Sequence, residues 1–180
     1  MNAFLGATVA GRVGQVGHAL VARWIHYDDG LVTVLSCRER VLFDRLSPAD
    51  RAHALRVAGR LHHAGYDGRD EETRQLLRAA LLHDIGKADQ GVRLPHRVAH
   101  VALKAIAPRW QARMAADPRG WRRPFFALAH HAELGAEALT RAGSDSLTIS
   151  LVRYHDDALP APLARYDHLL AALRRADDEG

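Results

Sequence analysis

Apolar residues recur every three to four positions along most of the chain, which is the spacing of amphipathic helices. Only residues 31–36 are rich enough in β-branched side chains for a short strand, and they equally suit a buried helical turn. The pattern therefore predicts an all-α protein. We expect helices over 18–25, from 48 to the turn at 65–68, from 71 to 82, from 95 onward, from 124 to 142, from 145 to 153 and over 163–176, with a looser connection over 110–123.

Polar residues and prolines mark where these helices begin. Pro48 suits a first helical position, where its missing N–H is no loss. Gly86, after the third predicted helix, is expected to be a left-handed stop. The side chains expected to accept hydrogen bonds from first-turn amides are Ser47, Asp70 and either Ser144 or Asp145.

The composition is that of one globular domain. The chain has 180 residues, of which 48% are hydrophobic and 26% charged. The chain has a single cysteine, Cys37, and its first residues contain neither a basic segment nor a long apolar run. We therefore expect a cytoplasmic protein with no membrane partner. The net charge is +4, but the basic residues, nearly all arginine, are spread along the chain among acidic ones, so a nucleic-acid partner is not expected.

A histidine and a carboxylate stand side by side at the end of a strongly apolar helix, in Leu81-Leu82-His83-Asp84-Ile85-Gly86-Lys87. Both groups are costly to bury unless something compensates them, and a divalent metal ion compensates both by binding a nitrogen and an oxygen. The alternative is that His83 and Asp84 cap the helix and face water. Further ligands must decide between the two.

Other ligand-type residues lie in or beside apolar helical stripes: His53, His131, His155 and Asp177. Taken alone, His53 also suits a core histidine bonded to a carbonyl group. Together with His83 and Asp84 these residues come from five predicted helices, and six ligands exceed what one ion needs. A carboxylate such as Asp84 can bridge two ions. His96 and His100 have no carboxylate between them, so we interpret this i, i+4 pair as a surface or secondary feature.

The order of these residues resembles the HD-domain superfamily of metal-dependent phosphohydrolases. The resemblance covers residues 43–178; residues 1–42 are treated as an N-terminal extension that packs on the same domain. Beyond the His-Asp-Ile-Gly-Lys motif, three segments are similar to those of the family: His53 to Ala58 to its first-histidine helix, His131 to Ala136 to its His-x-x-x-Gly-Ala segment, and Leu170 to Asp178 to its closing helix.

The resemblance implies an HD-domain helical bundle with a metal core of His53, His83, Asp84 and Asp177. His131 and His155 are similar to the extra ligands of the dinuclear branch, in which Asp84 bridges two ions of iron, manganese, cobalt or zinc. Asp84 and Lys87 are then the catalytic residues, with Lys87 binding a substrate phosphate oxygen. His130 could replace His131, which we prefer because its spacing to Gly135 and Ala136 matches the family.

Two features depart from the family pattern. Asp156 stands where a second histidine would follow His155, and no Gly-Tyr-Pro signature follows the His131 segment, which weighs against cyclic dinucleotide hydrolysis. The expected function is hydrolysis of a phosphoester or phosphoanhydride in a nucleotide or another small phosphate compound. A non-catalytic regulatory HD module and a di-iron oxygenase of the same fold are the alternatives. Residues 1–42 could serve as a dimer surface or as a lid.

Overall fold

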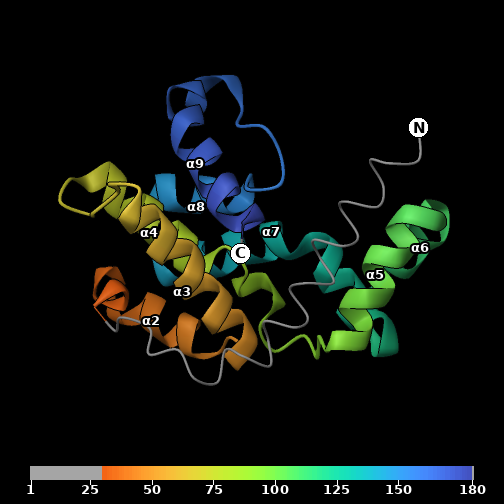
Figure 1. The fold of residues 1–180 in the computed structure, drawn as a ribbon. Helices are drawn as coiled ribbons and strands as arrows, with labels where there is room; N and C mark the ends of the chain where they lie inside the picture. The colour runs from red at the N-terminus through yellow and green to blue at the C-terminus, as the bar shows by residue number, and fades with distance from the viewer. Residues whose placement is uncertain (1–29, 180) are drawn as a thin grey trace.

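The computed structural model describes residues 30–179, and every α-helix, 3₁₀ helix and turn of that range fits an all-α fold (Figure 1). No strand occurs among these residues, so the predicted fold class is confirmed. The α-helices are α2 (Cys37–Asp44), α3 (Pro48–His63), α4 (Glu71–Leu82), α5 (Leu94–Ile106), α6 (Pro108–Met114), α7 (Arg123–Ala142), α8 (Ser146–Arg153) and α9 (Asp167–Asp178). The 3₁₀ helices are η2 (Leu31–Val34), η3 (Ile85–Lys87), η4 (Gly120–Arg122) and η5 (Ala161–Tyr166).

Helix α4 is the central element of the bundle. It contacts α2, α3, α8 and α9, and half of its side chains are buried. The largest fully buried side chains are leucines from these helices and from α7: Leu61, Leu76, Leu77, Leu81, Leu82, Leu139, Leu151, Leu169 and Leu173. Each buried leucine stabilises the fold by about 1.5–3 kcal/mol relative to an exposed one. The core therefore fixes the end of α4, where His83 and Asp84 follow.

The predicted helix starts are confirmed by their hydrogen bonds. The Ser47 side chain accepts from the Asp50 amide at 3.2 Å, and Asp70 accepts from the Thr73 amide at 2.9 Å. Asp145, and not Ser144, caps α8, because its carboxylate accepts from the Thr148 amide. The helix predicted over residues 18–25 lies outside the described residues.

One segment settles a choice that the sequence left open, and two segments differ from the expectation. Residues 31–34 form the 3₁₀ helix η2, which resolves the choice between a strand and a helical turn. The prediction of a loose connection over 110–123 is wrong at its start, because the short helix α6 begins at Pro108 and continues to Met114. The last predicted helix is divided into η5 and α9. Over six residues the 3₁₀ and α periodicities are too similar for the apolar pattern to separate them.

Residues 31–44 pack on the bundle. Val32 and Phe43 join the hydrophobic core. The buried Glu39 carboxylate accepts a hydrogen bond from the Ser144 hydroxyl at 2.8 Å, and the Arg78 side chain donates to the Val34 carbonyl at 2.6 Å. The division of the chain at residue 43 stays a prediction.

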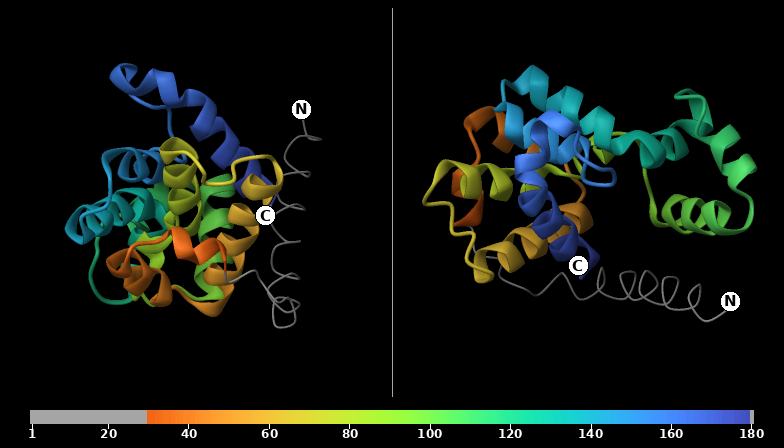
Figure 2. Two further views of the ribbon diagram at one scale, coloured as in Figure 1. Left: turned by 90° about the vertical axis from the view of Figure 1, so that its left-hand side faces the viewer. Right: turned by 90° about the horizontal axis from the view of Figure 1, so that it is seen from above.

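Helices α5 and α6 project from the bundle as an arm (Figures 1 and 2). They pack on each other and on α7, and Arg97 of α5 forms an ion pair with Asp50 of α3 at 2.6 Å. Among residues 30–179, no helix combines the length and the apolar character needed to cross a membrane.

Candidate metal centre

The His-Asp pair lies at the buried end of α4. The helix ends at Leu82, and His83 and Asp84 lead into η3 with 1% and 4% of their surfaces exposed. A pair that merely capped the helix would face water, so the structure rejects that interpretation.

Gly86 was expected to be a left-handed stop, and that prediction is wrong. Its φ is not among the positive values found in the described chain. A Cβ atom at this position would instead lie 2.0 Å from the His131 carbonyl oxygen. Glycine is therefore needed because the backbones of η3 and α7 touch, and this contact brings the Asp84 and His131 segments together.

Helix α7 is kinked where its histidines lie. His130 has non-helical angles, with φ −121° and ψ 16°. The kink leaves His130 exposed, with its ring 4.5 Å from that of Phe126, while His131 is buried. The geometry therefore favours His131 over His130 as a ligand.

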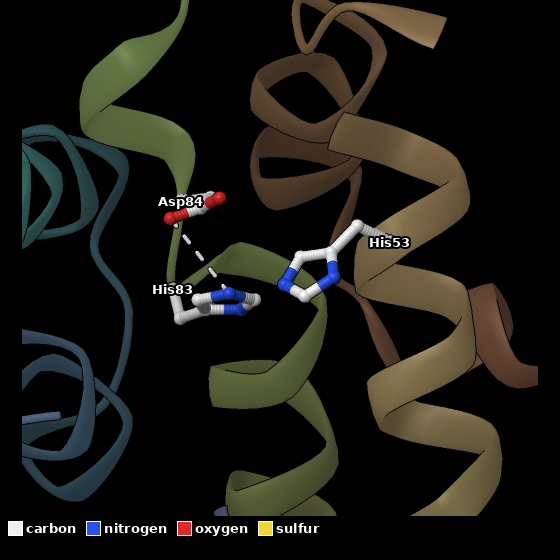
Figure 3. Close-up of side chains that lie close together, drawn as sticks. All are labelled: His53, His83 and Asp84. Atoms are coloured by element: carbon white, nitrogen blue, oxygen red, sulfur yellow. Dashed lines mark ion pairs between the residues drawn. The ribbon is translucent and has the colours of Figure 1, made fainter. Parts of the chain in front are cut away.

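Two groups of potential ligands form in the core, and they share Asp84. Within each group the nitrogen and oxygen atoms lie no more than 4.8 Å apart: His53, His83 and Asp84 in the first, and Asp84, His131 and His155 in the second. Figure 3 shows the first group, in which His53 of α3 faces His83 and the Asp84 carboxylate lies 3.7 Å from His83 Nε2.

Asp177, near the end of α9, lies beside the first group. Its Oδ1 atom is 2.8 Å from His53 Nε2 and 3.5 Å from His83 Nε2. Two atoms that bind one ion at right angles are separated by about 3 Å, because each metal–ligand bond is about 2.1 Å. The spacing around Asp177 is therefore suitable for ligands of one ion.

Backbone carbonyl groups orient three of the histidines in the same way. The Nδ1–H groups of His83, His131 and His155 donate to the carbonyl three residues earlier, at 2.9, 3.1 and 2.7 Å. The Nε2 atom of each ring is thereby directed toward the cluster, as in metal sites where an outer hydrogen bond fixes the tautomer.

The contact between His131 and His155 tests whether a metal fits. Their Nε2 atoms are 3.1 Å apart. Because each ring uses its Nδ1 proton on a carbonyl, the neutral rings turn two lone pairs toward each other, and no proton is available to bridge them. A cation that accepts both lone pairs satisfies this arrangement, so the residues present fit a metal ion.

Electrostatics keep the two histidines of the second group neutral and the carboxylates charged. Burial first, and the Lys87 ammonium second, lower the pKa of His131 to about 3. Burial and the charge of His83 also lower the pKa of His155. Burial raises the pKa of Asp84, but Lys87 and His83 outweigh it and hold that pKa well below its usual range.

Beside the first group, burial raises the pKa of the Asp177 carboxyl, but hydrogen bonds with His53 and His83 lower it by more. Burial lowers the pKa of His83, yet the charge of Asp84 and the hydrogen bond with Asp177 outweigh burial and raise it to about 9. Without a metal, His83 is therefore protonated at neutral pH, and a bound ion must displace that proton.

We expect the metal-free protein to lose stability as the pH rises from 6.5 to about 9. The folded state retains the His83 proton in this window, whereas the unfolded chain has already released it. The stabilisation is complete below pH 6.5 and is lost near pH 9, a change of about 3 kcal/mol. Denaturant unfolding in the presence of chelator, at the two ends of the window, measures it.

His83→Gln is the control for this pH dependence, because the variant has no proton to release at that position. His131 and His155 do not contribute above pH 6.5, since their pKa values are lowered and both states are then neutral. Equal stability at both pH values in the unaltered protein would contradict the assigned protonation of His83.

Lys87 is the last residue of the 3₁₀ helix η3. Its Nζ atom lies 2.6 Å from Asp84 Oδ1 in a partly buried ion pair. The structure thus brings both predicted catalytic residues into contact at the junction of the two ligand groups.

Two residues that the sequence did not assign to the site also reach it. The Asp156 Oδ2 atom lies 3.7 Å from His131 Nε2 and 3.8 Å from His155 Nε2. Arg174 of α9 donates to the His155 carbonyl at 2.6 Å and to the Tyr154 carbonyl at 3.0 Å, which holds the segment after α8 in place. Asp156 could have been suspected from the sequence because it follows His155 directly. No feature of the sequence pointed to Arg174.

The fold and this cluster define an all-α protein with histidine and aspartate ligands gathered in its core. The family model for the HD domain matches residues 51–178, and the chain belongs to that family. HD domains bind divalent metals, in agreement with the ligand groups seen here. No curated protein and no solved structure matches the chain.

Proposed function

We propose that the chain is a metal-dependent phosphohydrolase with two ions. The observation that carries the proposal is that Asp84 belongs to both ligand groups and is paired with Lys87. A carboxylate common to two groups is suited to bridge a pair of ions. The cation beside it suits a substrate whose reacting group is an anion, as a phosphoryl group is.

The residues divide into two ligand sets. His53, His83, Asp84 and Asp177 would hold one ion; Asp84, His131 and His155 would hold the other, with the Asp156 carboxylate beside them. When bound, the ions supply Lewis acidity toward a phosphoryl oxygen and toward water. The protein keeps the ligand atoms close and, through the lowered pKa values of His131 and His155, available as lone-pair donors at neutral pH.

Lys87 has a separate role in this proposal. Once Asp84 binds a metal, the ammonium group no longer has to compensate a bare carboxylate, and it can neutralise charge that grows on the phosphoryl oxygens. Its short distance from Asp84 places it at the point where the two ligand groups meet.

A hollow of about 450 Å³ beside the site supports a nucleotide as substrate. It is lined by Arg93, His96, Trp121 and Arg123, among others, and also by Asp89, whose Cα atom lies within about 8 Å of that of Lys87 because the two residues are two positions apart. Arg93 has no carboxylate partner among residues 30–179, and the indole of Trp121 is exposed. Guanidinium groups suit phosphate and an indole suits a nucleobase.

The test is elemental analysis of protein purified without chelator, combined with assays on an aryl phosphate and a panel of nucleotides under manganese, cobalt, iron or zinc. We expect about two ions per chain and metal-dependent release of phosphate. Bound metal without hydrolysis of any phosphate compound would overturn the proposal that the protein is a phosphohydrolase. Absence of both would favour a regulatory module, and oxygen consumption with iron alone would favour the oxygenase.

Lys87→Met is expected to retain the metal ions and to lower the rate of phosphate release by about 10²- to 10³-fold. The ligands are unchanged, but one group that stabilises the transition state is lost. Arg40→Met, which removes an exposed cation on α2, is the matched control and should have no effect. Loss of metal together with activity in the Lys87 variant would assign the lysine a role in holding Asp84 instead.

A further inference from the structure

The α5–α6 arm, defined as residues 94–119, exposes large apolar side chains, whereas most side chains of this kind in the bundle are buried. Six large hydrophobic residues are exposed in the described chain, and four belong to the arm: Leu94, Val98, Ile106 and Trp110. Helix α5 has no buried residue, although its sequence is strongly amphipathic. A concentration of exposed apolar side chains in one element of a protein is typical of an interaction site.

The apolar side of α5 is the side that faces outward. Leu94, Val98, Ala102 and Ala105 recur at helical spacing on one face, and all four are exposed. His96 and His100 lie on the opposite face and are partly buried; the His96 ring is 5.6 Å from that of Phe125 on α7. The helix thus turns its two histidines toward the protein, while Leu94, Val98, Ala102 and Ala105 face away from it.

The arm also concentrates positive charge. It contains five basic residues and one acidic residue, a formal charge of +4, which equals the charge of the whole chain. The rest of the protein is therefore neutral. Of the five cations only Arg97 forms an ion pair, with Asp50; within residues 30–179 the others have no carboxylate partner.

A hollow of about 710 Å³ lies at the tip of the arm. Its lining includes Arg109, Trp110 and Arg113 of α6. The two arginines are four residues apart and so lie on the same side of the helix. An indole beside two guanidinium groups is suited to the boundary between phosphate headgroups and acyl chains.

We propose that the α5–α6 arm binds the surface of an anionic membrane. The aliphatic face of α5 and the indole of Trp110 would enter the interface, while Lys104, Arg109 and Arg113 contact lipid phosphates. A helix that carries an apolar face with basic flanks is typical of such interfacial binding, which requires no spanning segment. Figure 2 shows that the arm extends beyond the bundle, so that it can meet a flat surface.

Two other occupants fit the arm less well. A nucleic acid would satisfy the cations but leave Val98 and Ile106, which is 80% exposed, without an apolar partner. A second copy of the chain, paired through the same face, would cover the aliphatic residues but would place two surfaces of charge +4 against each other. An anionic bilayer supplies both negative charge and an apolar phase.

The test is co-sedimentation of the full chain with vesicles of phosphatidylcholine that contain about 30% phosphatidylglycerol, against vesicles of phosphatidylcholine alone. We expect binding to the anionic vesicles only, weakened by salt. Brominated acyl chains should quench the tryptophan fluorescence of the bound protein. Failure to bind, or binding that quenching does not accompany, would overturn the proposal.

Val98→Glu and Val41→Glu form a matched pair of variants. Both valines are exposed on helices, at 55% and 64%, and both changes add one negative charge, but Val41 lies on α2, outside the arm. We expect Val98→Glu to weaken vesicle binding at least about tenfold and Val41→Glu to do so far less. Arg109→Gln and Arg113→Gln should each weaken it about fivefold.

Two results would assign the arm to another partner and reject the membrane. Salt-sensitive binding of an oligonucleotide that depends on Arg109 and Arg113 but not on Val98, without vesicle binding, would indicate a nucleic acid. A concentration-dependent dimer that Val98→Glu converts to a monomer would indicate a second copy of the chain. Neither outcome depends on bound metal or on hydrolysis, so the test is independent of the proposed activity.

Discussion

Asp84→Ala is expected to remove both metal ions and to lower phosphate release at least about 10³-fold. Asp84 is the one residue that belongs to both ligand groups, so its loss takes an oxygen from each. It also leaves Lys87 and the protonated His83 in the core without the carboxylate that compensates them. Metal content by elemental analysis and initial rates under saturating metal measure the two effects.

Two further variants make this result specific. Asp178→Ala changes an exposed carboxylate beside Asp177 and should retain metal and activity. His155→Ala removes a ligand from the second group only, so we expect one ion per chain to be retained. If Asp84→Ala kept both ions, or if His155→Ala lost both, the arrangement of two groups around a shared carboxylate would be wrong.

The sequence was most informative where the controlling interactions are local. Ser47, Asp70 and Asp145 each accept a hydrogen bond from an amide three residues later, so the helix starts could be predicted from neighbouring residues alone. The division of the last helix into η5 and α9 could not, since both segments place apolar residues at similar intervals.

The structure brings the predicted ligands together. The apolar stripe of each helix faces the core, so ionisable residues at stripe positions are directed into the core as well. Asp156 was missed, since an exposed acidic residue after a histidine is common and only the fold turns it toward His131. The kink at His130 had no local signal. Charge averaged over the whole chain concealed the arm, although its five cations all lie within residues 94–119.

Gly86 is the position where a single methyl group should be most damaging. We expect Gly86→Ala to destabilise the protein by about 3 kcal/mol or more and to lower its melting temperature by about 6–12 °C. The added Cβ would lie 2.0 Å from the carbonyl oxygen, 2.7 Å from the carbonyl carbon and 2.8 Å from the Cα atom of His131. These are backbone atoms, so no side-chain rotation can relieve the contact. Thermal unfolding of the metal-free protein measures the effect.

Two other glycines separate this clash from a general effect of alanine. At Gly59, within α3, the nearest atom to a new Cβ is Leu31 Cδ1 at 4.0 Å, so Gly59→Ala should be neutral or stabilising by up to about 1 kcal/mol. At Gly135 the nearest atoms are side-chain methyl groups, Val152 Cγ1 at 3.2 Å and Ile85 Cγ2 at 3.3 Å, and an intermediate effect is expected. Because Gly86 holds η3 against His131, its variant should also lose metal from the second group before it unfolds. Equal stability of the Gly86 and Gly59 variants would show that η3 and α7 do not touch as the structure has them.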